Sequence, residues 1–164
     1  MKIRNVNRDD LTAIIEIENK GFNEQEAGTK EQYEDRIKNF RESFFVAVND
    51  DDQIMGFICG PAVKEQFIED WMYEENPKSV SRGGYQTVQT IAVSPDARGL
   101  GIGSLLLLEL ENHAKSDERI AMSLTCLIDR IPFYEKNGYK NMGISKSNHA
   151  DEQWFNMEKL INQF

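Results

Sequence analysis

The stretch "VSPDARGLGIGSLLL", Val93–Leu107, decides how the whole chain is interpreted. Glycines at positions 99, 101 and 103 alternate with aliphatic residues directly after Arg98, and an apolar run follows at once. Because each glycine costs backbone entropy on folding, their concentration here indicates a backbone that needs unusual freedom. A tight turn would explain it, and so would a loop whose N–H groups must approach a negatively charged ligand.

The segments on either side favour the ligand-binding explanation. Before the loop, "YQTVQTIAV" (85–93) is rich in β-branched residues and predicts a strand that ends at Ser94-Pro95. After it, "GSLLLLELENHAK" (103–115) predicts a helix with a broad apolar face. The first N–H groups of a helix lack internal partners and lie at the positive end of its dipole, so the loop suits a phosphate or pyrophosphate.

Two familiar phosphate-binding motifs do not match this loop. No Gly-Lys-Ser/Thr ends it, so it is not a P-loop. Its G-x-G-x-G spacing also differs from the G-x-G-x-x-G of dinucleotide-binding folds, and the strand before it is not the first of the chain.

The rest of the chain alternates predicted strands and helices. A first strand (1–6) precedes a helix (8–22) whose apolar stripe ends near Gly21, and Thr29 is the expected N-cap of a second helix (29–40). Two apolar runs (43–50 and 53–63) predict a hairpin, and residues 64–84 form a long, partly helical connection. Long connections in compact domains are often functional.

The C-terminal third continues this pattern. It predicts a strand (119–127), a short helix (131–139) with Pro132 in its first turn and Gly138 at its end, and two closing strands (139–144 and 152–160). Strands and helices in this order indicate an α/β fold, with a central, partly antiparallel sheet and helices on both faces.

Composition limits the function classes. The 164 residues predict a single domain spanning 1–164, and a net charge of −9 argues against nucleic-acid binding through a basic surface. The two cysteines, Cys59 and Cys126, lie in apolar runs and are expected to be buried thiols, and no metal-ligand spacing is present. The N-terminus has no apolar signal segment and no run would span a bilayer, so we expect a cytoplasmic protein without membrane contact.

Two motifs carry a family resemblance. "VSPDARGLGIGS" resembles the R/Q-x-x-G-x-G/A acyl-CoA signature of the GNAT N-acetyltransferase superfamily, with Arg98, Gly101 and Gly103 in place. "PFYEKNGY" resembles the second GNAT signature, with Tyr134 at its head. The resemblance implies a GNAT fold: a mixed, mostly antiparallel, twisted central sheet of about six to seven strands. It also implies acetyl-CoA as co-substrate, and dimers are common in the family.

Within that superfamily, the chain is similar to the arylalkylamine N-acetyltransferase branch. The similarity rests on "EIENKGF", "FICG" and "LTCLIDRIPFYEKNGY". Animal members of the branch carry two histidines on the strand before the loop, where this chain has Thr87 and Gln89. The base chemistry attributed to those histidines therefore does not transfer.

The resemblance assigns roles to individual residues. The strand edge at Ile91, Ala92 and Val93 would pair with the pantetheine arm of CoA, and the loop would hold its pyrophosphate. Tyr134 would protonate the departing thiolate as general acid. The residues expected to contact CoA are Ile91, Ala92, Val93, Arg98, Gly99, Leu100, Gly101, Ile102, Gly103, Ser104 and Phe133.

The acceptor is expected to be a small primary amine: an arylalkylamine, a polyamine or another amino compound. Candidate residues of its pocket are Phe22, Tyr33, Phe57, Thr87 and Gln89. An alkylamine is almost wholly protonated at neutral pH, so a base or a water relay must take its proton, and a relay positioned by Thr87 and Gln89 is favoured. His113, His149, Glu24, Glu74 and Glu75 are weaker candidates. A protein N-terminus or lysine as acceptor, and a non-catalytic CoA-binding module, stay open as alternatives.

Overall fold

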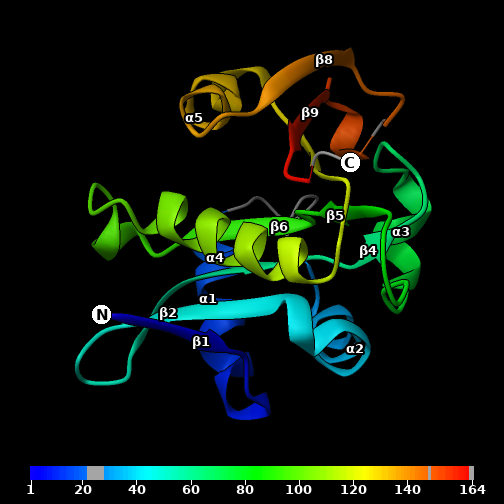
Figure 1. Ribbon diagram of the computed structural model, residues 1–164. Helices are drawn as coiled ribbons and strands as arrows, with labels where there is room; N and C mark the ends of the chain where they lie inside the picture. The colour runs from blue at the N-terminus through cyan, green and yellow to red at the C-terminus, as the bar shows by residue number, and fades with distance from the viewer. Residues whose placement is uncertain (22–27, 148, 163–164) are drawn as a thin grey trace.

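The computed structural model describes residues 1–21, 28–147 and 149–162. The strands form two sheets, and Figure 1 shows α4 on one side of them with α1 and α2 towards the other side. The α-helices are α1 (Leu11–Gly21), α2 (Lys30–Phe40), α3 (Asp70–Glu75), α4 (Ile102–Ser116) and α5 (Ile131–Lys136). Short 3-10 helices are η1 (Arg8–Asp10), η2 (Arg41–Ser43), η3 (Pro95–Ala97), η4 (Ile128–Arg130) and η5 (His149–Asp151).

The first sheet has the strand order β1-β2-β3-β6 and is antiparallel throughout. Its members are β1 (Lys2–Asn5), β2 (Phe44–Val48), β3 (Ile54–Cys59) and β6 (Thr90–Val93). The second sheet has the order β4-β5-β7-β9-β8, in which only β5 and β7 run parallel. Its members are β4 (Ala62–Val63), β5 (Tyr85–Thr87), β7 (Ala121–Cys126), β8 (Lys140–Ile144) and β9 (Phe155–Leu160).

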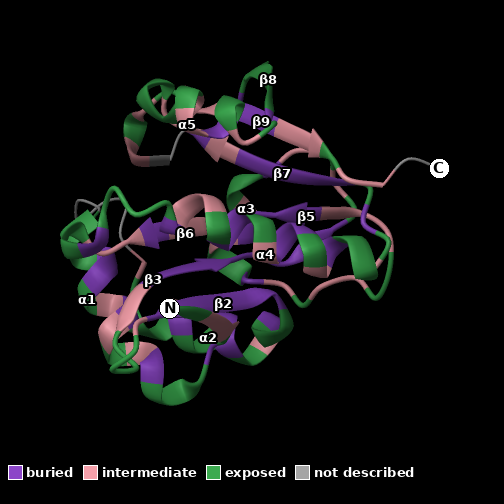
Figure 2. Cartoon of the chain, turned by 60° about the vertical axis from the view of Figure 1, so that its left-hand side comes forward, coloured by how far each residue is buried: buried purple, intermediate pink, exposed green. Residues whose placement is uncertain are grey.

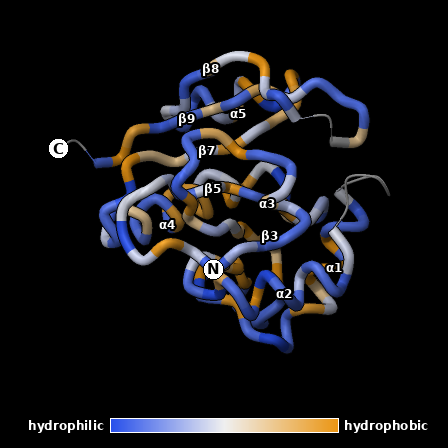
Figure 3. Tube along the Cα trace, turned by 90° about the vertical axis from the view of Figure 1, so that its right-hand side faces the viewer, coloured by the Kyte–Doolittle hydropathy of each residue, from blue (hydrophilic) through white to orange (hydrophobic). Residues whose placement is uncertain are grey.

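Alternation along β2 explains how the first sheet is covered on both faces. Phe44, Val46 and Val48 belong to the core cluster under α1 and α2, whereas Phe45 and Ala47 belong to the cluster under α4. Successive side chains of a strand point to opposite faces, so a fully apolar strand needs both covers. Figure 2 shows β2 and β3 buried between the helices, and Figure 3 shows hydrophilic and hydrophobic residues alternating along α2.

The sequence-based predictions of helix ends are confirmed. The Thr29 hydroxyl accepts a hydrogen bond from the Gln32 N–H (3.2 Å), and the Gln32 side chain accepts one from the Thr29 N–H (2.9 Å), which forms a capping box at α2. Gly138 follows α5 with φ +92°, a conformation that disfavours other residues.

The predicted α/β fold with helices on both faces is confirmed, and the strand count follows from two interruptions. Gly60 and Pro61 separate β3 from β4, and Val88 and Gln89 separate β5 from β6. The nine strands of the described residues therefore correspond to seven extended stretches of chain. Within the described residues, no helix is long and apolar enough to cross a membrane, and no group of three potential metal ligands occurs.

Candidate active site

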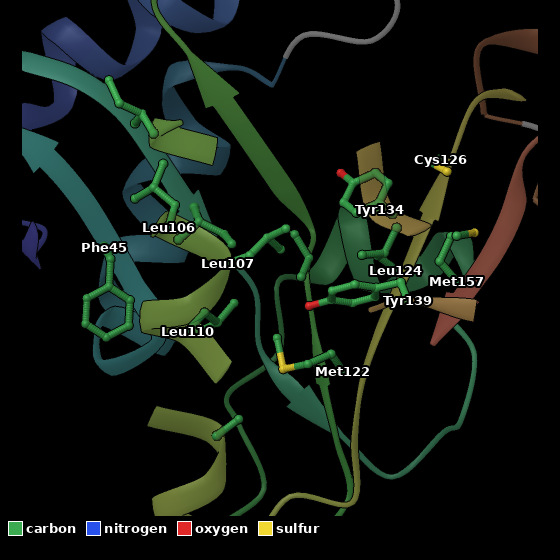
Figure 4. Packing of buried hydrophobic residues seen from close by; sticks show 14 of the residues in the cluster. Phe45, Leu106, Leu107, Leu110, Met122, Leu124, Cys126, Tyr134, Tyr139 and Met157 are labelled. Carbon is green, nitrogen blue, oxygen red and sulfur yellow. The ribbon is translucent and has the colours of Figure 1, made fainter. Parts of the chain in front are cut away.

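The site begins where two neighbouring strands part. β5 runs parallel to β7, with Tyr85 opposite Ala121 and Thr87 opposite Ser123, and the Val88 N–H donates to the Ser123 carbonyl (2.9 Å). Beyond this point the chain leaves β7, and β6 pairs with β3 alone in the part of the chain that the structure describes. β6 and β7 therefore diverge from this point on (Figure 4), and we call the interval between the two strands the gap.

A β-bulge marks the parting point. Thr90 is the register partner of Cys59, yet the Gln89 N–H also donates to the Cys59 carbonyl (2.8 Å). Two residues of one strand thus oppose a single residue of its partner, which is the definition of a bulge and bends the strand. The bulge turns β6 away from β7.

The register of β6 fixes where its remaining polar groups point. Val93 is opposite Gly56, and the Ser94 N–H donates to the Met55 carbonyl (2.7 Å). In an antiparallel ladder this pattern directs the N–H and C=O groups of Ala92 towards β3 and those of Ile91 and Val93 towards the open edge. The edge facing β7 therefore offers backbone donors and acceptors to an extended ligand.

The glycine loop closes one end of the gap. Gly99 (φ +81°) and Gly101 (φ +77°) adopt the left-handed conformation, and Gly101 is the N-cap of α4 with no side-chain cap. A Cβ on either would lie in open space, so the backbone angle rather than crowding requires glycine. The first N–H groups of α4 remain uncapped at an exposed turn, which fits the pyrophosphate that CoA would bring.

Gly103 is needed for a different reason. A Cβ there would lie 3.1 Å from the Phe133 ring, which packs over the start of α4 and makes an edge contact with Tyr134 at 5.0 Å. Phe133 thus connects α4 to the helix that carries Tyr134. Arg98 is exposed on the loop and forms no ion pair with the described residues.

Tyr134 lies between the parted strands. Figure 4 shows its ring between the green strand β6 and the olive strand β7, with the hydroxyl turned away from Tyr139. The residue is 7% exposed, and no hydrogen bond joins its hydroxyl to another described residue. Burial raises the pKa of Tyr134 above its usual range, with the neighbouring Cys126 thiol adding to the effect. The side chain is therefore a protonated donor at every ordinary pH.

A cluster of buried polar side chains lies on the α1–α2 side of the bulge. The Arg36 guanidinium donates to Asn76 Oδ1 (Nε, 3.1 Å) and Thr90 Oγ1 (Nη1, 3.4 Å) and stacks over the Tyr33 ring at 4.6 Å. Gln89 Nε2 donates to Asn76 Oδ1 (3.2 Å) and to the Met72 carbonyl (3.0 Å). We call Glu18, Tyr33, Arg36, Asn76 and Gln89 the buried polar cluster.

The predicted acceptor-pocket residues occupy different surroundings. Tyr33 is fully buried, with its ring packed against Phe44 and Phe57, and Gln89 belongs to the buried polar cluster. The Thr87 hydroxyl donates to the Pro61 carbonyl (2.6 Å), so it is engaged in holding the strand. Phe22 lies outside the described residues.

The other base candidates are also placed. Glu74 and Glu75 are exposed on α3, and His113 Nε2 lies 3.3 Å from Asp117 on α4. Glu24 and the side chain of His149 lie outside the described part of the chain. The gap between the strands thus has no described histidine beside it.

Sequence reasoning missed Glu18, Arg36 and Asn76. A signal existed for the first two, because Glu18 continues the apolar stripe of Leu11 and Ile14, and Arg36 lies among the buried positions of α2. Charged residues at stripe positions of two adjacent helices predict a buried contact between them. Asn76 carries no comparable signal, since it caps α3 in a left-handed conformation.

The comparison with family models identifies the chain. Residues 11–139 match the model of the acetyltransferase (GNAT) family. The chain belongs to the GNAT acetyltransferase family. The fold and the acyltransferase class expected from the two signature motifs are thereby confirmed. No curated protein sequence matches this one.

Solved structures agree with this GNAT fold. Ard1 from Thermoplasma volcanium is 19% identical with a TM-score of 0.79, covering 99% of this chain and 98% of that one. The ribosomal-protein-S18-alanine N-acetyltransferase from Escherichia coli is 16% identical with a TM-score of 0.74, covering 99% and 95%. The GphF GNAT-like decarboxylase in complex with isobutyryl-CoA is 14% identical with a TM-score of 0.84, covering 99% and 100%.

These similarities fix the fold of this GNAT protein and not its acceptor. The matched proteins include acetyltransferases named for ribosomal-protein substrates. The arylalkylamine branch therefore stays a prediction from the sequence.

Proposed function

We propose that this GNAT protein transfers the acetyl group of acetyl-CoA directly to a primary amine. The observation that carries the proposal is the parting of β6 from β7 at the Gln89–Thr90 bulge. It leaves the polar edge of Ile91 and Val93 open beside Tyr134, with the uncapped start of α4 at its end. An extended pantetheine arm fits such an edge as an added strand.

Two groups of this chain take different parts in the reaction: the strand edge orients the thioester, and Tyr134 supplies a proton. The strand edge orients the thioester, so that the amine attacks its carbonyl carbon, a C–N bond forms and the C–S bond breaks. Tyr134 donates its proton to the departing sulfur, because a thiolate comparable to that of cysteine leaves more readily when protonated. The raised pKa of Tyr134 keeps that proton available.

Within this proposal the acceptor is a small amine, and residues 64–84 support that choice. The Tyr73 hydroxyl contacts Thr125 Oγ1 (3.3 Å), and Ser147 Oγ donates to Asp70 Oδ1 (2.5 Å). Ser123 Oγ also donates to the Gln66 carbonyl (2.7 Å). The segment thus ties α3 to β7 and to the loop after β8, which narrows the end of the gap where an acceptor would enter.

A protein N-terminus is the second candidate acceptor. Two structurally similar proteins are named as ribosomal-protein-alanine N-acetyltransferases, and they cover 98% and 99% of this chain. The bridging contacts of α3 argue against a peptide lying in an open groove.

The test is thiol release from acetyl-CoA with tryptamine, phenylethylamine, spermidine and a short peptide with a free N-terminus. Turnover on a small amine supports the proposal, and turnover on the peptide alone supports the second candidate. If acetyl-CoA binds and no amine is acetylated, the enzymatic proposal is wrong and a CoA-binding module is the better description.

A further inference from the structure

The buried polar cluster has four polar atoms to which no described residue makes a hydrogen bond of good geometry. Glu18 Oε2, Tyr33 Oη, Asn76 Nδ2 and Gln89 Oε1 are inaccessible to solvent and lack a hydrogen-bond partner. Each of these residues is at least nine-tenths buried. Because buried polar groups in folded proteins almost always have partners, four unsatisfied atoms in one cluster indicate sites for bound water.

The cluster connects α1 to the bulge in a continuous series of contacts. The Tyr33 hydroxyl neighbours the Glu18 carboxyl, and the Tyr33 ring lies under the Arg36 guanidinium. Arg36 bonds to Thr90, the first residue of β6, and to Asn76, which also accepts from Gln89. The series ends where the strands part, which is where the reacting amine would lie.

The contacts of Glu18 differ from those of a carboxylate in a structural ion pair. Its Oε1 accepts a hydrogen bond from the Gly28 N–H (2.7 Å), whereas Arg36 directs its bonds to Asn76 and Thr90. No direct ion pair joins Glu18 to Arg36 in the described part of the chain. The second carboxylate oxygen makes no hydrogen bond of good geometry with the described residues, and the Tyr33 hydroxyl is the neighbour of this carboxyl group.

We propose that Glu18 accepts the proton that the acceptor amine must lose, through water bound at Gln89 and Asn76. This inference rests on the proposed acetyl transfer. The ammonium group gives one proton to water, which passes one to the carboxylate, so that a free amine and a neutral Glu18 result. The amine then attacks the thioester, its second proton replaces the one that Tyr134 gives to sulfur, and Glu18 later releases its proton to solvent.

The surroundings suit a group that changes charge during turnover. Among the described residues, the ionisable groups that face Glu18 are Tyr33 and Arg36 from α2 and Cys59 from β3. Burial raises the pKa of Glu18, while the Gly28 N–H, the Tyr33 hydroxyl and the Arg36 charge oppose the shift. A base with a raised pKa accepts a proton more readily near neutral pH, and the nearby cation keeps its charged form accessible.

The experiment measures pH profiles of kcat/KM for the parent, Glu18→Gln and the control Glu16→Gln, which changes an exposed carboxylate on the same helix. The probes are phenylethylamine and its less basic β,β-difluoro analogue, which has nearly the same shape. The parent profile is expected to be flat between the pKa values of Glu18 and the amine. Glu18→Gln should instead rise about tenfold per pH unit, because only free amine reacts.

At pH 7 the expected loss in Glu18→Gln is about 10²–10³-fold with phenylethylamine, shrinking towards high pH and with the fluorinated amine. Equal losses on both amines, or a flat profile in the variant, would overturn the role of Glu18. If Glu18→Gln does not fold, Glu18→Asp replaces it and should give an intermediate slope, whereas a parent-like slope overturns the proposal. A parent that binds acetyl-CoA and acetylates no amine refutes the proposed function itself, and this inference falls with it.

Discussion

The two halves of the candidate site are formed by different groups, one by backbone and the other by side chains. The half proposed for CoA consists of backbone: the free edge of β6 and the uncapped N–H groups at the start of α4. The other half consists of buried side chains drawn from α1, α2, α3 and the bulge. A backbone-built half requires only local conformation, whereas a side-chain-built half requires that several elements pack correctly at once.

The largest effect is expected where the two halves meet. Tyr134→Phe should lower kcat by about 10²–10⁴-fold, since it removes the general acid. CoA affinity should stay the same, because the ring still packs against Phe133 and Tyr139. Steady-state kinetics and calorimetry measure the two quantities, with Tyr85→Phe as a control on β5.

The pH dependence of the same enzyme provides a second test of Tyr134. The raised pKa keeps the hydroxyl protonated, so any fall in kcat caused by its ionisation should come above the ordinary tyrosine value of about 10. A fall near neutral pH that is absent in Tyr134→Phe would contradict this assignment.

Substitutions in the half formed by buried side chains should lower the free energy of unfolding as well as the activity. Arg36→Met removes the cation that faces the buried Glu18 carboxylate, so we expect a loss of about 3–5 kcal/mol in unfolding free energy. Adding Glu18→Gln should recover part of that loss, because the uncompensated charge disappears. Urea denaturation of both single variants and the double variant measures the coupling, and strict additivity would show that the two residues are independent.

The backbone-built half should respond to conformation. Gly101→Val places a branched residue at φ +77°, a backbone strain of about 1–3 kcal/mol. If the loop relaxes to relieve the strain, recovering the binding conformation should weaken CoA binding by roughly 5–150-fold. Calorimetry with CoA measures the affinity, and Gly21→Ala, in helical backbone with open space around it, is the control. Unchanged affinity would show that the loop does not hold the pyrophosphate.

The smallest effect is expected from changing loop side chains. Leu100→Ala should alter CoA affinity less than about twofold, because the exposed side chain is dispensable if the N–H groups make the contacts. A loss comparable to that of Gly101→Val would mean that this half, too, is built from side chains.

The same contrast explains what the sequence could predict. Glycines, alternating apolar residues and helix caps are local signals, so the loop at 98–104, the strand at 121–126 and the cap at Thr29 were all predictable. The break between β5 and β6 was not, because a bulge is defined by the partner strand rather than by its own residues.

The buried polar cluster was even less accessible to prediction. Its members are spread from Glu18 to Gln89, and only Glu18 and Arg36 carry a sequence signal, as charged residues at buried helix positions. Branch-level similarity directed attention to Thr87 and Gln89, and the structure engages Thr87 with Pro61 instead. Connecting Glu18 and Arg36 to Asn76 and Gln89 requires tertiary contacts, because no sequence spacing encodes that link.

The connection between β4 and β5 has a consequence for how this enzyme could diversify. Val63 and Tyr85 are direct register partners, so residues 64–84 leave and rejoin the sheet at neighbouring points. Exchanging such a loop for one of another length changes its closure entropy only slowly, at about 0.6 kcal/mol per doubling. The segment can therefore change in length at a small entropic cost, provided that Asn76 keeps its contacts with Arg36 and Gln89. New acceptors could be sampled by varying the rest of it, while the half proposed for CoA stays unchanged.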